Sequence, residues 1–411
     1  MRLKSIVFNI ALTGIGTVFG LILCEIGLHI GGVSYPSFFT ADEYRGVALR
    51  PGAEGWWLQE GEAYIRINSA GLRDREHTKV KPAKTVRIAV LGDSYAAAFQ
   101  VSMEDTFWSV MERELGQCAP FANRKVEVIN FGVSGYGTVQ ELMTLRHYVW
   151  DYDPDVVVLA FTTGNDVRNN LRALEADPLK PYLVYEDGKP ILDSSFRETS
   201  EFRARNSVIA KVFYGLLNYS RTLQVLNQLR NTINNRQSLA QQREIASQAA
   251  GSELGIEESV YFEPRNVLWE DAWHVTEAAL LQMQTEVKQK GVKFLIVTLS
   301  NSIQVHPDPQ VRQAFMKRFG IQELLYPDLR IEALAKREGI SILTLAPVLQ
   351  AYAEQHKVFL HGFANAIMGG GHWNAQGHKI AGQLIAQKLC AEFSLRASSV
   401  ETPSCVGKFS S

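Results

Sequence analysis

Short apolar runs of strand length alternate with longer helical patterns from residue 85 onward. Five of these runs are rich in Val, Ile and Leu with few polar interruptions: residues 86–91, 126–130, 156–161, 292–299 and 340–345. Helical patterns follow at about 106–116, 139–150, 272–290, 309–319, 326–338 and 375–393. Strands that alternate with helices predict an α/β fold with a parallel sheet, and near-continuous apolar strands are typical of sheets covered by helices on both faces.

Two segments interrupt this alternation. Residues 34–84 carry Trp56–Trp57 and an alternating stretch at 64–67, which predicts a strand-rich lead-in packed on the main sheet. Residues 171–265 hold amphipathic helical patterns at 208–217 and 223–229, followed by a Gln-rich polar run, so we expect a helical insertion that forms either a lid over the site or a cover for its rim. The expected units are therefore 1–33, 34–84, 85–393 and a tail over 394–411.

The N-terminus has a pattern of its own. Arg2 and Lys4 precede 20 residues without a charge, from Ser5 to Cys24. That length spans a bilayer as a helix, whereas the apolar region of a cleaved signal peptide is about 7–15 residues. A lipoprotein site at Cys24 is disfavoured because the bulky Leu23 precedes it. We expect a single-pass anchor in the inner (cytoplasmic) membrane, with the basic end in the cytoplasm and the rest of the chain on the periplasmic side.

Composition narrows the possible partners. The chain has 46% hydrophobic and 21% charged residues, as is usual for a globular protein, and its 42 basic and 43 acidic residues leave a net charge of -1. Because it has no dense basic stripe, we expect no nucleic-acid partner. It also has no cluster with metal-ligand spacing and no nucleotide-binding glycine loop, so no metal and no cofactor are predicted. Protein partners are not indicated.

Candidate chemistry lies just after the predicted strands. Ser94 follows the first strand in Gly-Asp-Ser-Tyr, Gly132 follows the second, and Asn165 follows the third in Gly-Asn-Asp. Because parallel strands end at the same edge of a sheet, we expect the three to meet there. His372, just before the last predicted helix, is placed to act as a general base toward the Ser94 hydroxyl. The N–H groups of Ser94 and Gly132 and the Asn165 amide would form an oxyanion hole.

Taken singly, each of these residues has an ordinary structural explanation: a turn glycine, a helix N-cap or a buried histidine. Together and in this order, the Ser94, Gly132, Asn165 and His372 blocks resemble the SGNH, or GDSL, hydrolase family of esterases and acyltransferases over about residues 85–393. The resemblance implies a flavodoxin-like sheet in strand order 2-1-3-4-5, a Ser94 nucleophile, an oxyanion hole with Gly132 and Asn165, and a His372 base.

One position departs from the family pattern. The resemblance implies Asp three residues before the histidine, and this chain has Gly369 there. That carboxylate ordinarily holds the imidazole in the correct tautomer and stabilises the imidazolium. We therefore expect a Ser94–His372 dyad in which a main-chain carbonyl of the glycine run 369–371 orients the ring. A weakened or inactive site is the alternative.

The resemblance also leaves two reactions open. Envelope polysaccharide O-acetyltransferases of the alginate type resemble this chain in their Gly-Asp-Ser block, but in them the His-Trp segment precedes the serine, and here it follows. We expect a serine esterase that cleaves acyl esters, acetyl above all, of envelope carbohydrate or lipid. An O-acyltransferase and a non-catalytic carbohydrate-binding or assembly module are the alternatives.

The cysteines fit an oxidising compartment. The helices that leave Ser94 and His372 both start at the catalytic edge, so Cys118 and Cys390 should end near one another at the opposite edge, with Cys405 just beyond. We predict one disulfide from Cys118 to either Cys390 or Cys405. Three unpaired thiols are the alternative, because pairing does not follow from spacing alone.

Overall fold

A five-stranded parallel sheet forms the centre of the computed structural model, which describes residues 2–234 and 258–400. Its strands are β5 (Thr85–Gly92), β6 (Lys125–Asn130), β7 (Val156–Thr162), β10 (Lys293–Leu299) and β11 (Ser341–Thr344). They lie in the spatial order β6–β5–β7–β10–β11, with every neighbouring pair parallel. Numbered along the chain, this is the order 2-1-3-4-5, which confirms the predicted doubly wound α/β fold.

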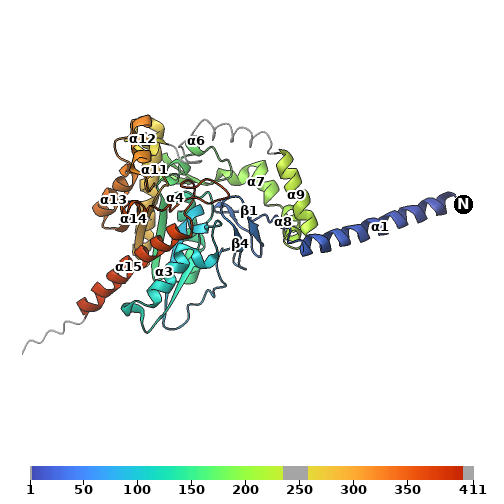
Figure 1. Cartoon of the computed structure of the whole chain (residues 1–411), viewed down its shortest axis with the longest axis horizontal. Coiled ribbons are helices and arrows are strands. Elements are labelled where there is room, and N and C mark those ends of the chain that lie inside the picture. Colours follow the sequence, from blue (N-terminus) through green and yellow to red (C-terminus); the bar gives the residue numbers. More distant parts are fainter. Residues whose placement is uncertain (1, 235–257, 401–411) are drawn as a thin grey trace, which may run out of the picture.

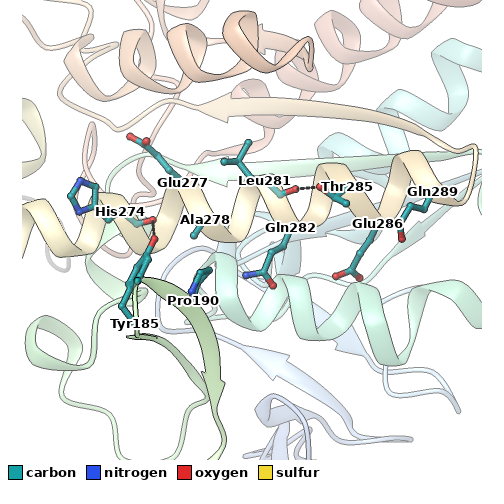
Figure 2. Close-up of a pocket in the computed structure, with 11 residues that line it drawn as sticks. Tyr185, Pro190, His274, Glu277, Ala278, Leu281, Gln282, Thr285, Glu286 and Gln289 are labelled. Carbon is teal, nitrogen blue, oxygen red and sulfur yellow. Dashed lines mark hydrogen bonds between the residues drawn. The ribbon is translucent and has the colours of Figure 1, made fainter.

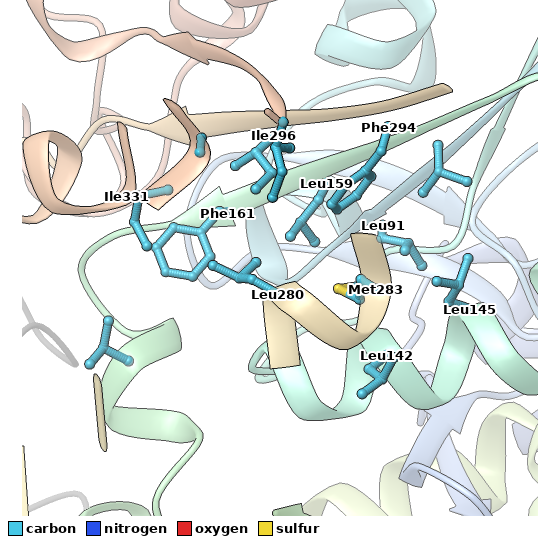
Figure 3. Close-up of a cluster of buried hydrophobic side chains, with 14 of the residues drawn as sticks. Leu91, Leu142, Leu145, Leu159, Phe161, Leu280, Met283, Phe294, Ile296 and Ile331 are labelled. Atoms are coloured by element: carbon cyan, nitrogen blue, oxygen red, sulfur yellow. The ribbon is translucent and has the colours of Figure 1, made fainter. Parts of the chain in front are cut away.

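Helices cover both faces of the sheet, each over its own buried cluster. Alternate residues of β7 belong to different clusters, Leu159 and Phe161 to one and Val158 and Ala160 to the other, so the strand is apolar throughout. The first face is covered by α4 (Thr138–His147), α11 (Val267–Gln289), α12 (Pro309–Phe319) and α13 (Tyr326–Glu338). In Figure 3, residues of α4 and α11 pack against this face of the strands. The second face is covered by α3 (Phe107–Gly116), α14 (Ala346–His356) and α15 (Ala375–Val400).

Several element boundaries differ from those expected. The helix expected over 139–150 is divided into α4 and the 3-10 helix η3 (Val149–Tyr152), and α14 was not predicted. α11 starts five residues early because the Asn266 side chain caps it, accepting a hydrogen bond from the Trp269 N–H. α15 continues seven residues past the expected end at residue 393, into the segment expected as a tail. α12 and α13 begin and end where predicted.

The insertion after residue 170 is mixed rather than purely helical. Its helices are α6 (Arg172–Glu175), α7 (Ser200–Arg205), α8 (Val208–Leu217) and α9 (Arg221–Asn234), with the 3-10 helices η4 (Ser195–Glu198) and η5 (Glu258–Tyr261). It also contains an antiparallel hairpin of β8 (Tyr182–Glu186) and β9 (Lys189–Asp193). Asp187 and Gly188, which join these strands, have φ of 50° and 74°, the conformation of a two-residue Asp-Gly hairpin turn. The sequence contained that signal, and our prediction missed it.

The lead-in consists of two antiparallel hairpins, β1 (Phe39–Asp42) with β2 (Gly46–Leu49) and β3 (Glu54–Trp57) with β4 (Ala63–Arg66). Its buried side chains, including Ile65, pack against Phe99 and Tyr136. These two residues belong to the loops that follow β5 and β6, so the lead-in covers the carboxyl edge of the sheet and not one of its faces. The connection between β3 and β4 is thereby held at that edge.

The first helix, α1 (Arg2–Ile30), projects from the rest of the molecule, and α8 and α9 lie at its base (Figure 1). Its segment Ser5–Ile30 contains an 18-residue stretch with a mean hydropathy of 2.2, and that stretch is not buried within the structure. It is long and apolar enough for a single-pass anchor, and a signal sequence has the same properties.

Candidate functional site

Ser94 begins the short helix α2 (Ser94–Ala97) directly after β5, at the carboxyl edge of the sheet. The carboxylate of Asp93 caps this helix, because its Oδ1 accepts a hydrogen bond from the Tyr95 N–H at 2.9 Å. The buried guanidinium of Arg73 donates to the main-chain oxygens of Ala97 and Ala98 at the other end of α2. The turn that carries the Ser94 hydroxyl is thus held at both ends.

The imidazole of His372 lies against the Ser94 hydroxyl. Its Nε2 is 2.8 Å from Ser94 Oγ, within hydrogen-bond distance. The segment before α15 is fixed by a β-bridge between His361 and Trp373 and by a hydrogen bond from the Gly362 N–H to the His372 carbonyl. The Tyr95 hydroxyl donates to the Gly371 carbonyl at 3.2 Å, so the loops of Ser94 and His372 also contact each other directly.

A carboxylate, and not a main-chain carbonyl, occupies the other nitrogen of the ring. Glu60 Oε2 lies 2.6 Å from His372 Nδ1, and Oε1 accepts a hydrogen bond from the His372 N–H at 2.8 Å. The prediction of a dyad oriented by a carbonyl of the run 369–371 is therefore wrong. The carbonyl of Gly371 instead lies 2.7 Å from Nδ1 of the buried His361. Ser94, His372 and Glu60 form a continuous hydrogen-bonded series.

Glu60 reaches this position through the connection between β3 and β4. The loop is clamped by Asn365, whose side-chain oxygen accepts from the Gly61 N–H at 2.9 Å and whose amide donates to the Gly61 carbonyl at 2.8 Å. Burial raises the pKa of the Glu60 carboxyl, but hydrogen bonds and the charge of His372 outweigh it, so the pKa lies below its usual value of 4.5. Glu60 is therefore ionised at neutral pH.

Sequence reasoning missed Glu60 because nothing in its spacing connects it to His372, 312 residues later. One signal was available in the glycine run. Gly371 has a φ of +71°, and a Cβ at this position would overlap Oε1 of Glu60. The glycine thus allows the Glu60 carboxylate to approach the backbone. A glycine run is typical of a segment that another group approaches closely, and this was the signal in residues 369–371.

The other two predicted residues also lie beside Ser94. Asn165 follows β7, and its Nδ2 donates to Asp93 Oδ2 at 3.0 Å, which leaves the second amide hydrogen for a ligand. Gly132 packs so tightly on α2 that a Cβ there would overlap the Ala96 side chain. Its N–H donates to Asn130 Oδ1 at 3.0 Å. To donate to an oxyanion, the Gly132 N–H must share or give up its hydrogen bond to Asn130. The Asn165 amide and the Ser94 N–H are therefore the better candidates for the oxyanion hole.

Behind Asp93 lie two more buried carboxyl groups, Glu141 on α4 and Asp166 at the start of α5 (Asp166–Asn169). Burial raises the pKa of Asp93, although hydrogen bonds from Asn165 and Tyr95 favour its charged form. Burial and the Asp93 charge raise the pKa of Glu141 well above its usual value. Burial and mutual repulsion thus disfavour more than a few negative charges on these three groups. Asp93, whose carboxylate holds Asn165, therefore has largely neutral neighbours.

A disulfide joins Cys118 to Cys390, with their Cα atoms 6.2 Å apart. Cys118 follows α3 and Cys390 lies within α15, so the bond links two of the helices that cover the second face of the sheet. Cys24 in α1 is a free cysteine, and Cys405 lies outside the described residues.

A separate hollow of about 690 Å³ lies between α11 and the β8–β9 hairpin (Figure 2). Its lining includes Glu277 and Glu286, but both carboxylates form ion pairs, with Arg330 and Arg146 respectively. None of Ser94, His372 and Glu60 lines it. The Tyr185 and Thr285 hydroxyls in its lining donate to main-chain carbonyls and not to a base, so the hollow is not the candidate active site.

No family model matches the chain, and no curated protein is significantly similar to it in sequence. Similar solved structures include an acetyl xylan esterase, with a TM-score of 0.36 and 12% identity over 75% of this chain and 99% of that chain. A GDSL-like lipase from Bacteroides thetaiotaomicron has a TM-score of 0.32 and 12% identity, covering 74% of this chain and 88% of its own.

A catalytic mutant of an acetylxylan esterase from Geobacillus stearothermophilus has a TM-score of 0.35 and 12% identity, covering 77% of this chain and 96% of its own. Scores and identities this low leave the family open, so the function is inferred from the chain's own residues.

Proposed function

We propose that this chain is a membrane-anchored serine ester hydrolase that works through an acyl-Ser94 intermediate. The observation that carries the proposal is the series from Ser94 Oγ to His372 Nε2, at 2.8 Å, and from His372 Nδ1 to Glu60 Oε2, at 2.6 Å. A hydroxyl beside a base that is itself oriented by a carboxylate is the arrangement that activates a serine nucleophile.

In the acylation step, Ser94 Oγ attacks the ester carbonyl carbon while its proton passes to His372 Nε2. The negative charge on the carbonyl oxygen is stabilised by the Ser94 N–H and the free hydrogen of the Asn165 amide. When the tetrahedral intermediate collapses, the carbon–oxygen bond to the alcohol breaks and the alkoxide takes the proton from His372. The alcohol leaves and the acyl group stays on Ser94.

In the deacylation step, water attacks the acyl-enzyme and gives its proton to His372, which returns it to Ser94 Oγ as the acid is released. Glu60 stays ionised during both steps because its pKa is lowered. Its two oxygens bind the ring and the main-chain N–H of the same histidine, which fixes the tautomer with the proton on Nδ1 and stabilises the imidazolium.

We infer the cellular location and the substrate class from the N-terminal segment and the disulfide. The uncharged stretch from Ser5 to Cys24 supports an inner-membrane anchor, and Arg2 and Lys4 support a periplasmic catalytic domain. The Cys118–Cys390 bond supports the same oxidising side. Confinement to the membrane surface raises the effective concentration of envelope substrates. We therefore propose acyl esters of envelope carbohydrate or lipid, with short acyl chains preferred.

The full-length chain in detergent micelles tests the reaction. The wild type should be labelled by a fluorophosphonate and should hydrolyse nitrophenyl esters, with acetyl preferred over longer chains. Ser94→Ala should lose both properties and keep the circular dichroism spectrum. Ser134→Ala, in the loop after β6, is the control that should keep both. A wild type that is neither labelled nor active would support a binding module in place of an enzyme.

Hydrolysis and transfer are separated by the fate of the acyl group. The enzyme is incubated with an acetyl donor and a deacetylated polysaccharide. Free acetate as the main product supports the proposed hydrolase, because water is then the acceptor. Acetylated sugar as the main product would make the chain an O-acyltransferase that uses the same Ser94 intermediate.

A further inference from the structure

The helices α8 and α9 present an apolar surface beside α1. On α8 the apolar side chains recur on one face, at Val208, Ile209, Val212 and Leu216, and all are more than half exposed. On α9 the side chains of Leu226, Leu229 and Ile233 recur at spacings of three and four residues and are also more than half exposed. We call these seven residues the α8–α9 apolar face.

The N-terminal turn of α9 is attached to α1 by a defined set of hydrogen bonds. The carboxylate of Glu25, near the end of α1, accepts from the Ser220 hydroxyl at 2.9 Å, the Arg221 N–H at 2.6 Å and the Thr222 N–H at 3.0 Å. These donors lie at the first turn of α9, whose N–H groups have no partner within the helix. Glu25 thus caps α9 from another element of the chain.

A second attachment follows directly after α1. The Tyr35 N–H donates to Gln224 Oε1 at 3.0 Å, and the Arg221 guanidinium donates to Ser34 Oγ at 2.6 Å. α9 is therefore held on both sides of the point where the chain leaves α1. The direction of α9 relative to α1 is set by these bonds, and Figure 1 shows α9 running across the direction of α1.

The position of Glu25 along α1 determines the depth in the membrane at which α1 and α9 meet. The uncharged stretch from Ser5 to Cys24 rises about 30 Å as a helix, the thickness of the hydrocarbon core. Glu25 follows it immediately, so it lies at the membrane–water interface when α1 spans the bilayer. A helix that starts at this depth and runs across the anchor lies along the membrane surface.

The composition of the two helices suits that place. α8 and α9 have 10 and 14 residues, too short to cross a bilayer, and they combine an apolar face with the exposed basic residues Lys211 and Arg230. Tyr219, between the helices, is 82% exposed, and tyrosine is enriched at membrane interfaces. These are the properties of helices that lie in the interface with their apolar side toward the acyl chains.

We propose that the α8–α9 apolar face docks on the bilayer that α1 spans and so fixes the orientation of the catalytic domain above the membrane. The inference rests on the anchor of the proposed function, and it adds a second, surface contact with the lipid. A single spanning helix leaves the domain free to tilt over the membrane, whereas a spanning helix and a docked helix pair hold the sheet edge of Ser94 in one orientation to the bilayer.

Spin labels on the full-length chain in lipid nanodiscs test the docking. Cys24 and Cys405 are replaced by serine, and a nitroxide is placed at Leu226→Cys or Ile209→Cys. The matched control is Leu329→Cys on α13, because Leu329 is 50% exposed and Leu226 is 55% exposed. Labels at 226 and 209 should collide more with lipid-soluble oxygen than with a water-soluble nickel complex, and the label at 329 should show the reverse.

Three outcomes would overturn the docking. Labels at 226 and 209 could be as accessible to nickel as the label at 329, which would place the face in water. They could show spin–spin broadening that disappears on dilution with unlabelled chain, which would make a second copy the partner. N-terminal sequencing could also find a mature chain that begins after residue 30, which would remove the anchor. Nitrophenyl acetate turnover, measured on the same nanodiscs, shows separately whether the proposed esterase activity is present.

Discussion

The Glu60 carboxylate forms hydrogen bonds with His372 at two points, the ring nitrogen Nδ1 and the main-chain N–H, although it lies 312 residues earlier in the chain. The lead-in that carries Glu60 packs on the loops that follow β5 and β6. The site is thus assembled from two units, because the α/β domain provides the serine, the histidine and the amide, and the lead-in provides the carboxylate.

Replacing the carboxylate by an amide tests this assembly. Glu60→Gln keeps the shape but removes the negative charge, and an amide that donates to Nδ1 would favour the wrong tautomer. We expect kcat for nitrophenyl acetate to fall by about 10³- to 10⁴-fold, as for triads whose carboxylate is replaced by an amide. Glu62→Gln, an exposed residue just before β4, is the control and should keep wild-type kinetics. Unchanged turnover in Glu60→Gln would show that Glu60 has no part in the reaction.

The glycine run offers a matched pair of substitutions. At Gly371 a Cβ would overlap the Glu60 carboxylate and the φ of +71° strains an L-residue, whereas at Gly370 the nearest atom to a Cβ is the Ile367 side chain at 3.3 Å. Displacing a catalytic group by about 1 Å can cost about 100-fold in rate. Gly371→Ala should therefore lose about that factor in kcat/KM, and Gly370→Ala should lose little. Equal losses in the two variants would show that general loosening of the loop is responsible.

The features that the sequence predicts are those whose signals lie among neighbouring residues or in the order of the strands. Ser94, Gly132 and Asn165 were placed at one edge because each follows an apolar run, and parallel strands end together. The bounds of α12 and α13 have local causes, because Pro309 lies in the first turn of α12 and Gly320 and Gly339 are the C-caps of the two helices. Local patterns and the order of strands thus gave the sheet and most of the candidate site.

What could not be predicted depends on contacts between distant segments. Glu60 lies in a loop that has no helical or strand period. The packing of the lead-in, with Ile65 against Phe99, and the hydrogen bonds of Asn365 to Gly61 bring that loop to the site. The capping of α9 by Glu25 is of the same kind, because the two residues belong to segments almost 200 positions apart. No periodicity or spacing rule indicates such pairs.

The disulfide should contribute to stability and not to catalysis. It closes a loop of 272 residues between α3 and α15, at the edge of the sheet opposite Ser94. Cross-linking a loop of this length restricts the unfolded chain, so Cys118→Ser should lower the free energy of unfolding by about 2–5 kcal/mol. Denaturant unfolding measures the loss, and kcat for nitrophenyl acetate at a temperature below the transition should be unchanged. A large fall in kcat without a change in stability would show that the bond positions the site.

The buried Glu141 makes stability depend on pH in a predictable direction. Its side-chain oxygens have no hydrogen-bond partner among the described residues, and burial and the Asp93 charge raise its pKa well above 4.5. Because the folded state holds the proton more tightly than the unfolded state, the contribution to stability is complete below pH 4.5 and is lost as the pH rises through the folded-state pKa. The slope is at most about 1.4 kcal/mol per pH unit for one proton.

Glu141→Gln removes this titration and also relieves Asp166, whose raised pKa is caused by burial first and by the Glu141 charge second. We therefore expect the melting temperature of Glu141→Gln, relative to the wild type, to rise between about pH 4 and about pH 8. Thermal unfolding followed by circular dichroism measures the difference, with Glu62→Gln as the control that should follow the wild type at both values. If the difference stayed constant across this range, Glu141 would be losing its proton in the folded and unfolded states alike, and its burial would not hold it neutral.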